Sequence, residues 1–170
     1  MPAEPHAIIV MGVAGSGKST LALALARHYG YEFLDADDFH AVDAKVQMAR
    51  GVPLTDAQRD PWVELLRCAL RANAQQGRST VMAFSGLRAD HRQRLRDSGV
   101  PMRFVFLHAP SAVIAARLAA RWDHFMPGDL LASQLDALQA PIAEPDVIAV
   151  EVSGSPGLIL KRVIAALETA

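Results

Sequence analysis

The sequence predicts an α/β fold, a five-stranded parallel sheet with helices on both faces and a small lid. Two observations carry this prediction. Short apolar segments alternate with longer helical segments along the chain, which is typical of a parallel sheet with helical crossovers. Between the first strand and the first helix, residues 12–20 spell Gly-Val-Ala-Gly-Ser-Gly-Lys-Ser-Thr and match the phosphate-binding pattern G-x-x-x-x-G-K-[ST].

Each expected strand is a short run of apolar or β-branched residues bounded by turn-forming residues. In order, the strands cover residues 6–11, 31–34, 79–84, 103–107 and 146–150. Right-handed crossovers bring the carboxyl ends of parallel strands to one edge of the sheet, where ligands bind in such folds. We therefore expect the chemistry at that edge.

The expected helices lie between and after these strands. In order, they cover residues 18–29, 41–50, 55–76, 89–97, 111–121, 129–139 and 156–167. Gly30 is expected to end the first helix, because glycine readily adopts the left-handed conformation found there. Either Thr55 or Asp56 is expected to cap the third helix, with Pro61 in its first turn. Ser111 is expected to cap the fifth.

Composition indicates one domain that spans residues 1–170. Hydrophobic residues make up 51% of the chain, and 17 basic against 18 acidic side chains give a net charge of −1. This balance argues against a general nucleic-acid-binding protein. No apolar run approaches the roughly 20 residues that span a bilayer, and the N-terminus has no signal-peptide pattern, so we expect a cytoplasmic protein without membrane partners. The single cysteine, Cys68, is expected to be a small buried core residue.

The glycine-rich loop predicts nucleotide binding. Its expected phosphate-binding residues are Gly12, Val13, Ala14, Gly15, Ser16, Gly17, Lys18, Ser19 and Thr20. Glycines let backbone N–H groups point inward around anionic oxygens, and the helix N-terminus adds positive potential. Lys18 is expected to reach the β- and γ-phosphates, and the Ser19 hydroxyl to bind Mg²⁺. A dinucleotide-binding motif is excluded, because Thr20 stands where its third glycine belongs.

Two carboxylates, Asp35 and Asp37, follow the second expected strand. In a parallel sheet this end faces the γ-phosphate, so one carboxylate is expected to hold Mg²⁺ and the other to accept a proton from the phosphoryl acceptor. The alternative is a solvated acidic turn or a helix cap. No N-K-x-D-like base-recognition motif is evident, which argues against a GTPase and favours a small-molecule kinase.

Arginines and histidines near the same edge are the remaining candidates. Arg117 and Arg121 share a helix face, and residues 121–129 are expected to form a lid over bound nucleotide, although a solvated basic face is the alternative. Arg88 and Arg92 also share a face and are candidates for an anionic acceptor. Two histidines, His40 and His124, are expected to bind a polyol or else to be structural or exposed.

The chain resembles the small P-loop gluconokinases, relatives of the shikimate and nucleoside-monophosphate kinases. The most specific block is residues 51–62, with the pattern G-x-P-L-x-D-x-x-R-x-P-W. The resemblance also rests on residues 11–19, 33–40, 45–50, 85–88, 124–126 and 133–134. It implies a P-loop kinase fold and transfer of the γ-phosphate of ATP to the 6-hydroxyl of D-gluconate, which gives 6-phospho-D-gluconate in sugar-acid metabolism.

The resemblance also implies roles for individual residues. Asp35 matches the metal-associated carboxylate, Asp37 the carboxylate at the acceptor hydroxyl, and Arg121 the lid arginine. Four further residues match segments of the acceptor site or its closure, namely His40, Arg59, Arg88 and His124. The expected cofactors are ATP and Mg²⁺, and the family is commonly homodimeric.

The sequence departs from the family pattern only on the acceptor side. Alanine replaces the usual proline at Ala41, arginine replaces lysine at Arg88, and histidine replaces tyrosine at His91; Ala44 and Gln47 stand where Asn and Lys are usual. A kinase for another sugar acid or a shikimate-like acceptor, and a non-catalytic nucleotide-binding regulator, are therefore the alternative hypotheses.

Overall fold

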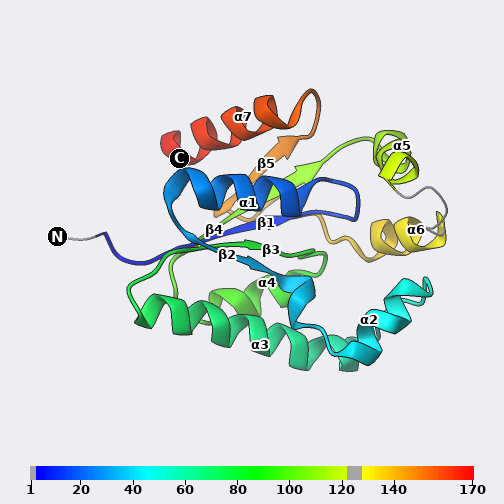
Figure 1. The fold of residues 1–170 in the computed structure, drawn as a ribbon, viewed down its shortest axis with the longest axis horizontal. Helices are drawn as coiled ribbons and strands as arrows, with labels where there is room; N and C mark the ends of the chain where they lie inside the picture. Colours follow the sequence, from blue (N-terminus) through cyan, green and yellow to red (C-terminus); the bar gives the residue numbers. More distant parts are fainter. Residues whose placement is uncertain (1–2, 122–127) are drawn as a thin grey trace.

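The computed structural model describes residues 3–121 and 128–170, and its described part contains a five-stranded, all-parallel sheet (Figure 1). The strands are β1 (Ala7–Met11), β2 (Glu32–Asp35), β3 (Thr80–Ala83), β4 (Met102–His108) and β5 (Val147–Glu151). Their order in the sheet is β2-β3-β1-β4-β5. The glycine-rich loop therefore follows the central strand β1 at the middle of the carboxyl edge. The sequence predicts a ligand-binding edge here, and the strand order adds the central position.

Helices cover both faces of this sheet. They are α1 (Lys18–Tyr29), α2 (Val42–Ala49), α3 (Asp56–Gln75), α4 (Ala89–Arg96), α5 (Ser111–Arg121), α6 (Gly128–Ala137) and α7 (Pro156–Thr169), with a short 3₁₀ helix η1 (Ala36–Phe39). Figure 1 shows α1 and α7 over one face, α3 and α4 over the other, and α2, α5 and α6 beyond the carboxyl edge. In the described part of the chain, no helix is both long and apolar enough to cross a membrane.

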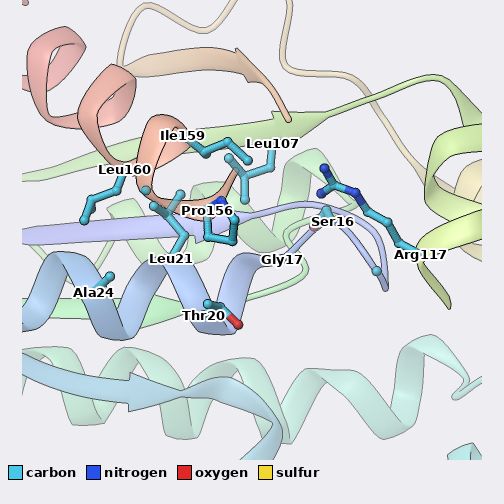
Figure 2. Close-up of a pocket in the computed structure, with 12 residues that line it drawn as sticks. Ser16, Gly17, Thr20, Leu21, Ala24, Leu107, Arg117, Pro156, Ile159 and Leu160 are labelled. Carbon is cyan, nitrogen blue, oxygen red and sulfur yellow. The ribbon is translucent and has the colours of Figure 1, made fainter. Parts of the chain in front are cut away.

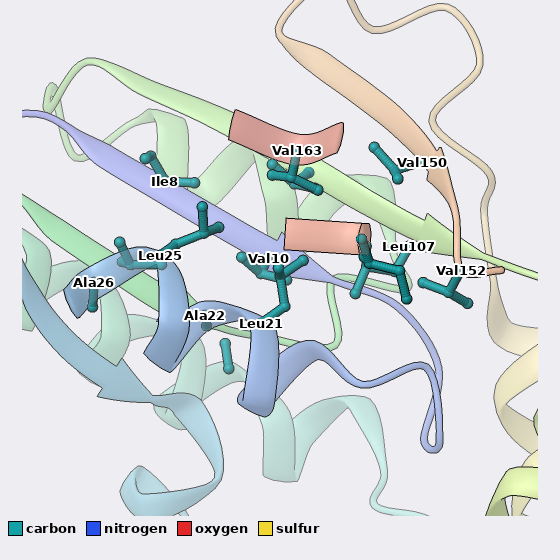
Figure 3. Packing of buried hydrophobic residues seen from close by; sticks show 14 residues of the cluster. Ile8, Val10, Leu21, Ala22, Leu25, Ala26, Leu107, Val150, Val152 and Val163 are labelled. Atoms are coloured by element: carbon teal, nitrogen blue, oxygen red, sulfur yellow. The ribbon is translucent and has the colours of Figure 1, made fainter. Parts of the chain in front are cut away.

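The alternating side chains of β1 divide the core into two layers. Ile8 and Val10 face α1 and α7, where they pack in the cluster of Figure 3 with Leu21, Leu25, Val150 and Val163. Ile9 and Met11 face α3 and α4 and pack with Trp62, Leu66, Leu70 and Phe104. Full burial of such side chains stabilises the fold by roughly 1.5–3 kcal/mol each. Both layers together hold the glycine-rich loop on a rigid strand.

Several local predictions are confirmed, and three are wrong. Gly30 ends α1 with a φ of +69°, and Thr55 caps α3 in a capping box with Gln58. However, Pro61 lies inside α3 beyond its first turn, and Ser111 is the first helical residue of α5 rather than its cap. Cys68 is exposed on α3, because its position faces solvent while Trp62, Val63, Leu66 and Leu70 form the buried stripe.

Candidate active site

The glycine-rich loop turns sharply between β1 and α1. Gly17, at the N-cap of α1, has a φ of +89°, and Gly15 has a φ of +80°. A Cβ atom at Gly15 would lie 2.7 Å from Cγ of Leu118, a buried residue of α5. Glycine is needed there because a side chain would be strained and would also displace Leu118.

Ser16 gives a direct indication that the loop binds a ligand. The residue is 1% exposed, and its Oγ is buried without a hydrogen-bond partner in the described part of the chain. An unsatisfied buried hydroxyl costs about 1–3 kcal/mol, so the native structure rarely retains one without a reason. The hydroxyl lies in a loop that forms an anion-binding nest at the start of a helix. A phosphate oxygen fits this site.

A cavity of about 340 Å³ adjoins the loop on the α7 side of the sheet (Figure 2). Gly15, Ser16, Gly17 and Thr20 contribute the phosphate-binding side. The other side is largely apolar and is formed by Leu21, Ala24, Leu107, Pro156, Gly157, Ile159 and Leu160. This combination suits a nucleotide, whose base is flat and whose phosphates are charged. Sequence reasoning missed the contribution of α7, because no local pattern around residue 156 indicates a ligand.

Arg117, which the sequence predicts to bind nucleotide, lines this same cavity. Its side chain projects from α5 alongside Ser16 and Gly17 (Figure 2). The guanidinium donates a hydrogen bond to the backbone oxygen of Val152 at 2.8 Å, which fixes its direction. A cation held in this way suits a nucleotide phosphate.

Ser19 and Asp35 meet beside the glycine-rich loop. The Ser19 hydroxyl donates a hydrogen bond to Oδ2 of Asp35 at 3.1 Å, and Oδ1 of Asp35 accepts one from the backbone N–H of Asp37 at 3.0 Å. Among the described residues, no group of three or more His, Cys, Asp or Glu side chains is arranged to hold a metal. Mg²⁺ is commonly bound by one or two protein oxygens and by substrate phosphates. A hydroxyl and a carboxylate beside a phosphate loop fit that donor set.

A second cavity, of about 310 Å³, lies on the other side of the loop and is referred to below as the acceptor cavity. Its ionisable lining residues are Lys18, Asp37, Arg59, Arg88 and His91. The other lining residues are Ala14, Met48, Ala49, Pro53, Leu54, Trp62, Ser85, Leu87, Ser133, Gln134 and Ala137. Three cations, one carboxylate and several hydrogen-bonding groups suit an anion that carries hydroxyl groups. Sequence reasoning did not assign Trp62, Ser133 or Gln134 to this cavity.

Arg88 is held firmly at the acceptor cavity. Its guanidinium donates to Asp90 at 2.9 Å and to Asp56 at 3.1 Å. The hydrogen bond with Asp90 is the main reason that the pKa of that carboxyl lies below its usual value. Because both acidic partners are more than half exposed, water screens them from the guanidinium. Arg88 can therefore bind a further anion at the cavity.

The comparisons with known proteins agree with this geometry. A family model described as an AAA domain matches residues 8–145. Gluconokinases from Gluconobacter oxydans (strain 621H) and Arabidopsis thaliana are 37% and 38% identical to this chain, over 96% and 92% of it and 92% and 89% of their own lengths. The crystal structure of a gluconokinase from Sinorhizobium meliloti 1021 has a TM-score of 0.89 at 37% identity and covers 98% of this chain and 93% of that chain.

This chain belongs to the gluconokinase family. It is a P-loop kinase, and both the recognition of the family and the fold class predicted from the sequence are confirmed. Two of the residues that depart from the family's usual pattern, Arg88 and His91, line the acceptor cavity. Gln47 does not; its side chain donates to the backbone oxygen of Pro53 at 2.9 Å and accepts from Gln58 at 2.9 Å. Gln47 therefore holds the connection between α2 and α3.

Arg92 is a correction to the sequence prediction, which placed it with Arg88 on an anionic acceptor. Its side chain is 1% exposed. The guanidinium is paired with the carboxylate of Glu144 and donates to the backbone oxygens of Gly86 and Gln139. Arg88 is the extended N-cap residue of α4, with φ −98° and ψ 136°, so the four-residue helical spacing does not bring the two side chains together. Arg92 is thus a structural residue of this kinase.

His40 is a second correction, because it lies behind the cavity wall. It is buried and stacks on Trp62, with ring centroids 4.0 Å apart. Burial is the main reason that the pKa of His40 lies below its usual value. Trp62 donates from Nε1 to the backbone oxygen of Ala36 at 2.7 Å and itself lines the cavity. His40 therefore supports Trp62 instead of contacting an acceptor.

The predicted lid falls largely beyond the residues that the structure describes. His124 lies outside them, and Arg121 is described only by its backbone, at the end of α5. Their predicted roles in closure and phosphoryl transfer stay predictions. By contrast, Asp37 and Arg59 line the acceptor cavity together with Lys18, so the sequence-predicted proton acceptor and one predicted acceptor-binding arginine share a cavity with the P-loop lysine.

Proposed function

We propose that this kinase transfers the γ-phosphoryl group of ATP to the 6-hydroxyl of D-gluconate in the presence of Mg²⁺. One observation carries the proposal. Lys18 of the P-loop lines the same cavity as the carboxylate of Asp37 and the guanidinium groups of Arg59 and Arg88. A phosphate donor on the loop and an anionic acceptor in the cavity would therefore meet at Lys18 and Asp37. The named gluconokinases among its relatives support gluconate as the acceptor.

The nucleotide would extend from the P-loop into the 340 Å³ cavity beside α7. Backbone N–H groups of the loop and the hydroxyl of Ser16 would bind its phosphates, and Arg117 would add a cation. Ser19 and Asp35 would hold Mg²⁺, which supplies charge neutralisation at the β- and γ-phosphates when bound. The apolar side chains near Pro156 and Leu160 would cover the base.

In the transfer step, Asp37 accepts the proton of the acceptor hydroxyl while that oxygen bonds to the γ-phosphorus. The bond between the γ-phosphorus and the bridging oxygen breaks, and ADP leaves with the electron pair. Lys18 offsets the negative charge on the transferring group, and we assign Arg121 the same role from the lid. Positioning of the two reactants is expected to supply much of the rate enhancement.

The carboxylate of gluconate requires a cation in the acceptor cavity. Arg88 and Arg59 are the candidates among the lining residues. Because a guanidinium binds a carboxylate through two parallel hydrogen bonds, arginine at position 88 gives directional binding that the usual lysine does not. Arg88 is already oriented by Asp56 and Asp90, which lowers the entropy cost of binding.

An ADP-release assay over D-gluconate, other sugar acids, shikimate and nucleoside monophosphates tests the proposal. We expect release that depends on gluconate and that Asp37→Asn lowers by about two to four orders of magnitude. The matched control is Asp38→Asn, an exposed neighbour outside the cavity lining, which should keep wild-type turnover. Release with a different acceptor alone would contradict gluconate specificity, and ATP binding without release for any acceptor would favour a nucleotide-binding regulator.

A further inference from the structure

His91 lies in the first turn of α4 and lines the acceptor cavity. The residue is 4% exposed. Its ring has no hydrogen bond to any residue in the described part of the chain. Because Ser16 Oγ is the only fully buried side-chain N or O atom without a partner among the described residues, the ring nitrogens of His91 each keep some accessible surface. The imidazole therefore reaches the cavity, and its polar atoms are open to a ligand there.

The buried position of His91 favours the neutral form of its ring. Burial is the main cause that lowers its pKa, and Arg88, Arg59 and Arg94 lower it further, against the opposing effect of Asp90. A neutral imidazole carries one N–H donor and one nitrogen acceptor. A hydroxyl group also donates and accepts, whereas a carboxylate only accepts. The chemical partner that fits His91 is therefore a hydroxyl group.

The position of His91 relative to Arg88 strengthens this assignment. The two residues are three apart at the start of α4, and both line the acceptor cavity. Arg88 offers a cation for a carboxylate, and His91 offers a neutral donor and acceptor beside it. An acceptor that carries a carboxylate and hydroxyl groups on neighbouring carbons would match this pair.

We propose that His91 is an acceptor-binding residue that hydrogen-bonds one non-reacting hydroxyl of the sugar acid and so selects polyhydroxylated acceptors. The inference rests on the proposed function, because it takes a sugar acid as the ligand. It goes further because it names His91 as the side chain that distinguishes gluconate from acids that lack the bound hydroxyl. A site that binds a hydroxyl in a buried pocket disfavours an analogue without it, because its own polar group is then left unpaired.

The test compares wild type, His91→Phe and His91→Gln on D-gluconate and on each monodeoxy analogue that retains the reacting 6-hydroxyl. For one of these analogues, the kcat/KM of wild type should be about ten-fold lower than for D-gluconate, as expected for loss of one neutral hydrogen bond. His91→Phe should lower kcat/KM for gluconate by about the same factor and show no further loss on that analogue. His91→Gln, which retains a donor and an acceptor, should recover part of the discrimination. The KM for ATP should stay unchanged in both variants.

His28→Phe is the matched control, because His28 is exposed on α1 and should leave every ratio at its wild-type value. Equal losses for His91→Phe on all analogues, or a parallel rise in the KM for ATP, would show a structural role and overturn the proposal. Thermal unfolding of each variant identifies a folding defect. In that case the wild-type protein with a non-hydrolysable ATP analogue is titrated with D-gluconate, and the ¹⁵N resonances of His91 are followed; unmoved resonances would overturn the proposal.

Failure of the proposed function would give results that differ from failure of the role proposed for His91. If wild type releases ADP with another sugar acid and not with gluconate, the choice of gluconate is wrong, and the same comparison is made with the deoxy analogues of that acid. If no acceptor supports release, the ¹⁵N titration is repeated with that panel of sugar acids. A shift of the His91 resonances then supports the binding role, and its absence contradicts it.

Discussion

The side-chain oxygen of Gln134 accepts a hydrogen bond from the backbone N–H of Ala14 at 2.6 Å. Gln134 belongs to α6 and also lines the acceptor cavity, while Ala14 belongs to the P-loop. Five residues further on, the side chain of Gln139 accepts from the backbone N–H of Ala89 at 2.6 Å, at the start of α4. The segment that begins with α6 therefore touches both the nucleotide loop and the helix that carries Arg88 and His91.

Gln134→Ala tests the link between α6 and the P-loop. We expect the KM values for ATP and for the acceptor to rise by about 2- to 13-fold, as expected from one hydrogen bond of 0.5–1.5 kcal/mol. The control is Gln93→Ala, an exposed residue of α4 whose side chain bonds to Asp97. Steady-state kinetics with ATP varied, then the acceptor varied, give the result. A KM for ATP equal to that of wild type would contradict a role for Gln134 at the P-loop.

Arg92→Ala is expected to destabilise the fold by about 3–5 kcal/mol, because it removes one of the two arginine partners of Glu144 and leaves the backbone oxygens of Gly86 and Gln139 without their donor. Its partner Glu144 also binds Arg96 and Arg96 binds Asp146. The control is Arg94→Ala, which removes a 32%-exposed side chain paired with Asp60 and should cost less than about 1 kcal/mol. Urea unfolding measures both. If both variants lose the same free energy of unfolding, the Arg92–Glu144 pair is not the main stabilising contact of this region.

The burial of His40 should make the free energy of unfolding of the protein depend on pH. Because burial lowers its pKa below the usual 6.5, the unfolded chain binds a proton that the folded chain does not. The free energy of unfolding should therefore fall as pH is lowered from about 6.5 through the folded pKa, at up to about 1.4 kcal/mol per pH unit for each such histidine. His40→Phe keeps a ring on Trp62 and should reduce this slope. Urea unfolding between neutral and acidic pH measures the slope, and an unchanged slope would show that His40 does not cause it.

Gly15→Ala and Gly77→Ala separate backbone strain from steric conflict. Both glycines have a φ between +70° and +85°, but a Cβ atom would meet Leu118 only at Gly15, since nothing lies within 4 Å at Gly77. Each variant should lose about 1–2 kcal/mol from the left-handed conformation. Gly15→Ala should lose more and raise the KM for ATP, whereas Gly77→Ala should leave that KM unchanged. If both raise it equally, the contact with Leu118 is not what fixes the loop.

The order of helices and strands and the P-loop could be predicted because their signals are local. Gly30 and Thr55 act within one helical turn, and the alternation of Ile8, Ile9 and Val10 follows from strand geometry. The role of Arg92 could not be predicted, because its partner Glu144 lies 52 residues further along the chain. The stacking of His40 on Trp62 likewise depends on how η1 packs against α3, which no short pattern encodes.

The acceptor cavity shows the same division. Asp37, Arg59 and Arg88 were predicted from strand ends and from family motifs, and all three line the cavity. Gln134 and the part of α7 near Pro156 were not predicted, because both approach the P-loop from distant parts of the sequence. Side chains brought in by tertiary packing are thus the part of the site that the structure adds.

The proposed roles of Lys18 and Asp37 in phosphoryl transfer to the 6-hydroxyl of D-gluconate rest on the cavity that both residues line. The most direct measurement is ³¹P and ¹³C NMR of the product formed from ATP, Mg²⁺ and D-gluconate. We expect a phosphorus nucleus coupled to carbon 6 of gluconate with wild type, and no phosphorylated gluconate with Lys18→Ala. A wild-type reaction without that product, or the same product yield with Lys18→Ala, would contradict these roles.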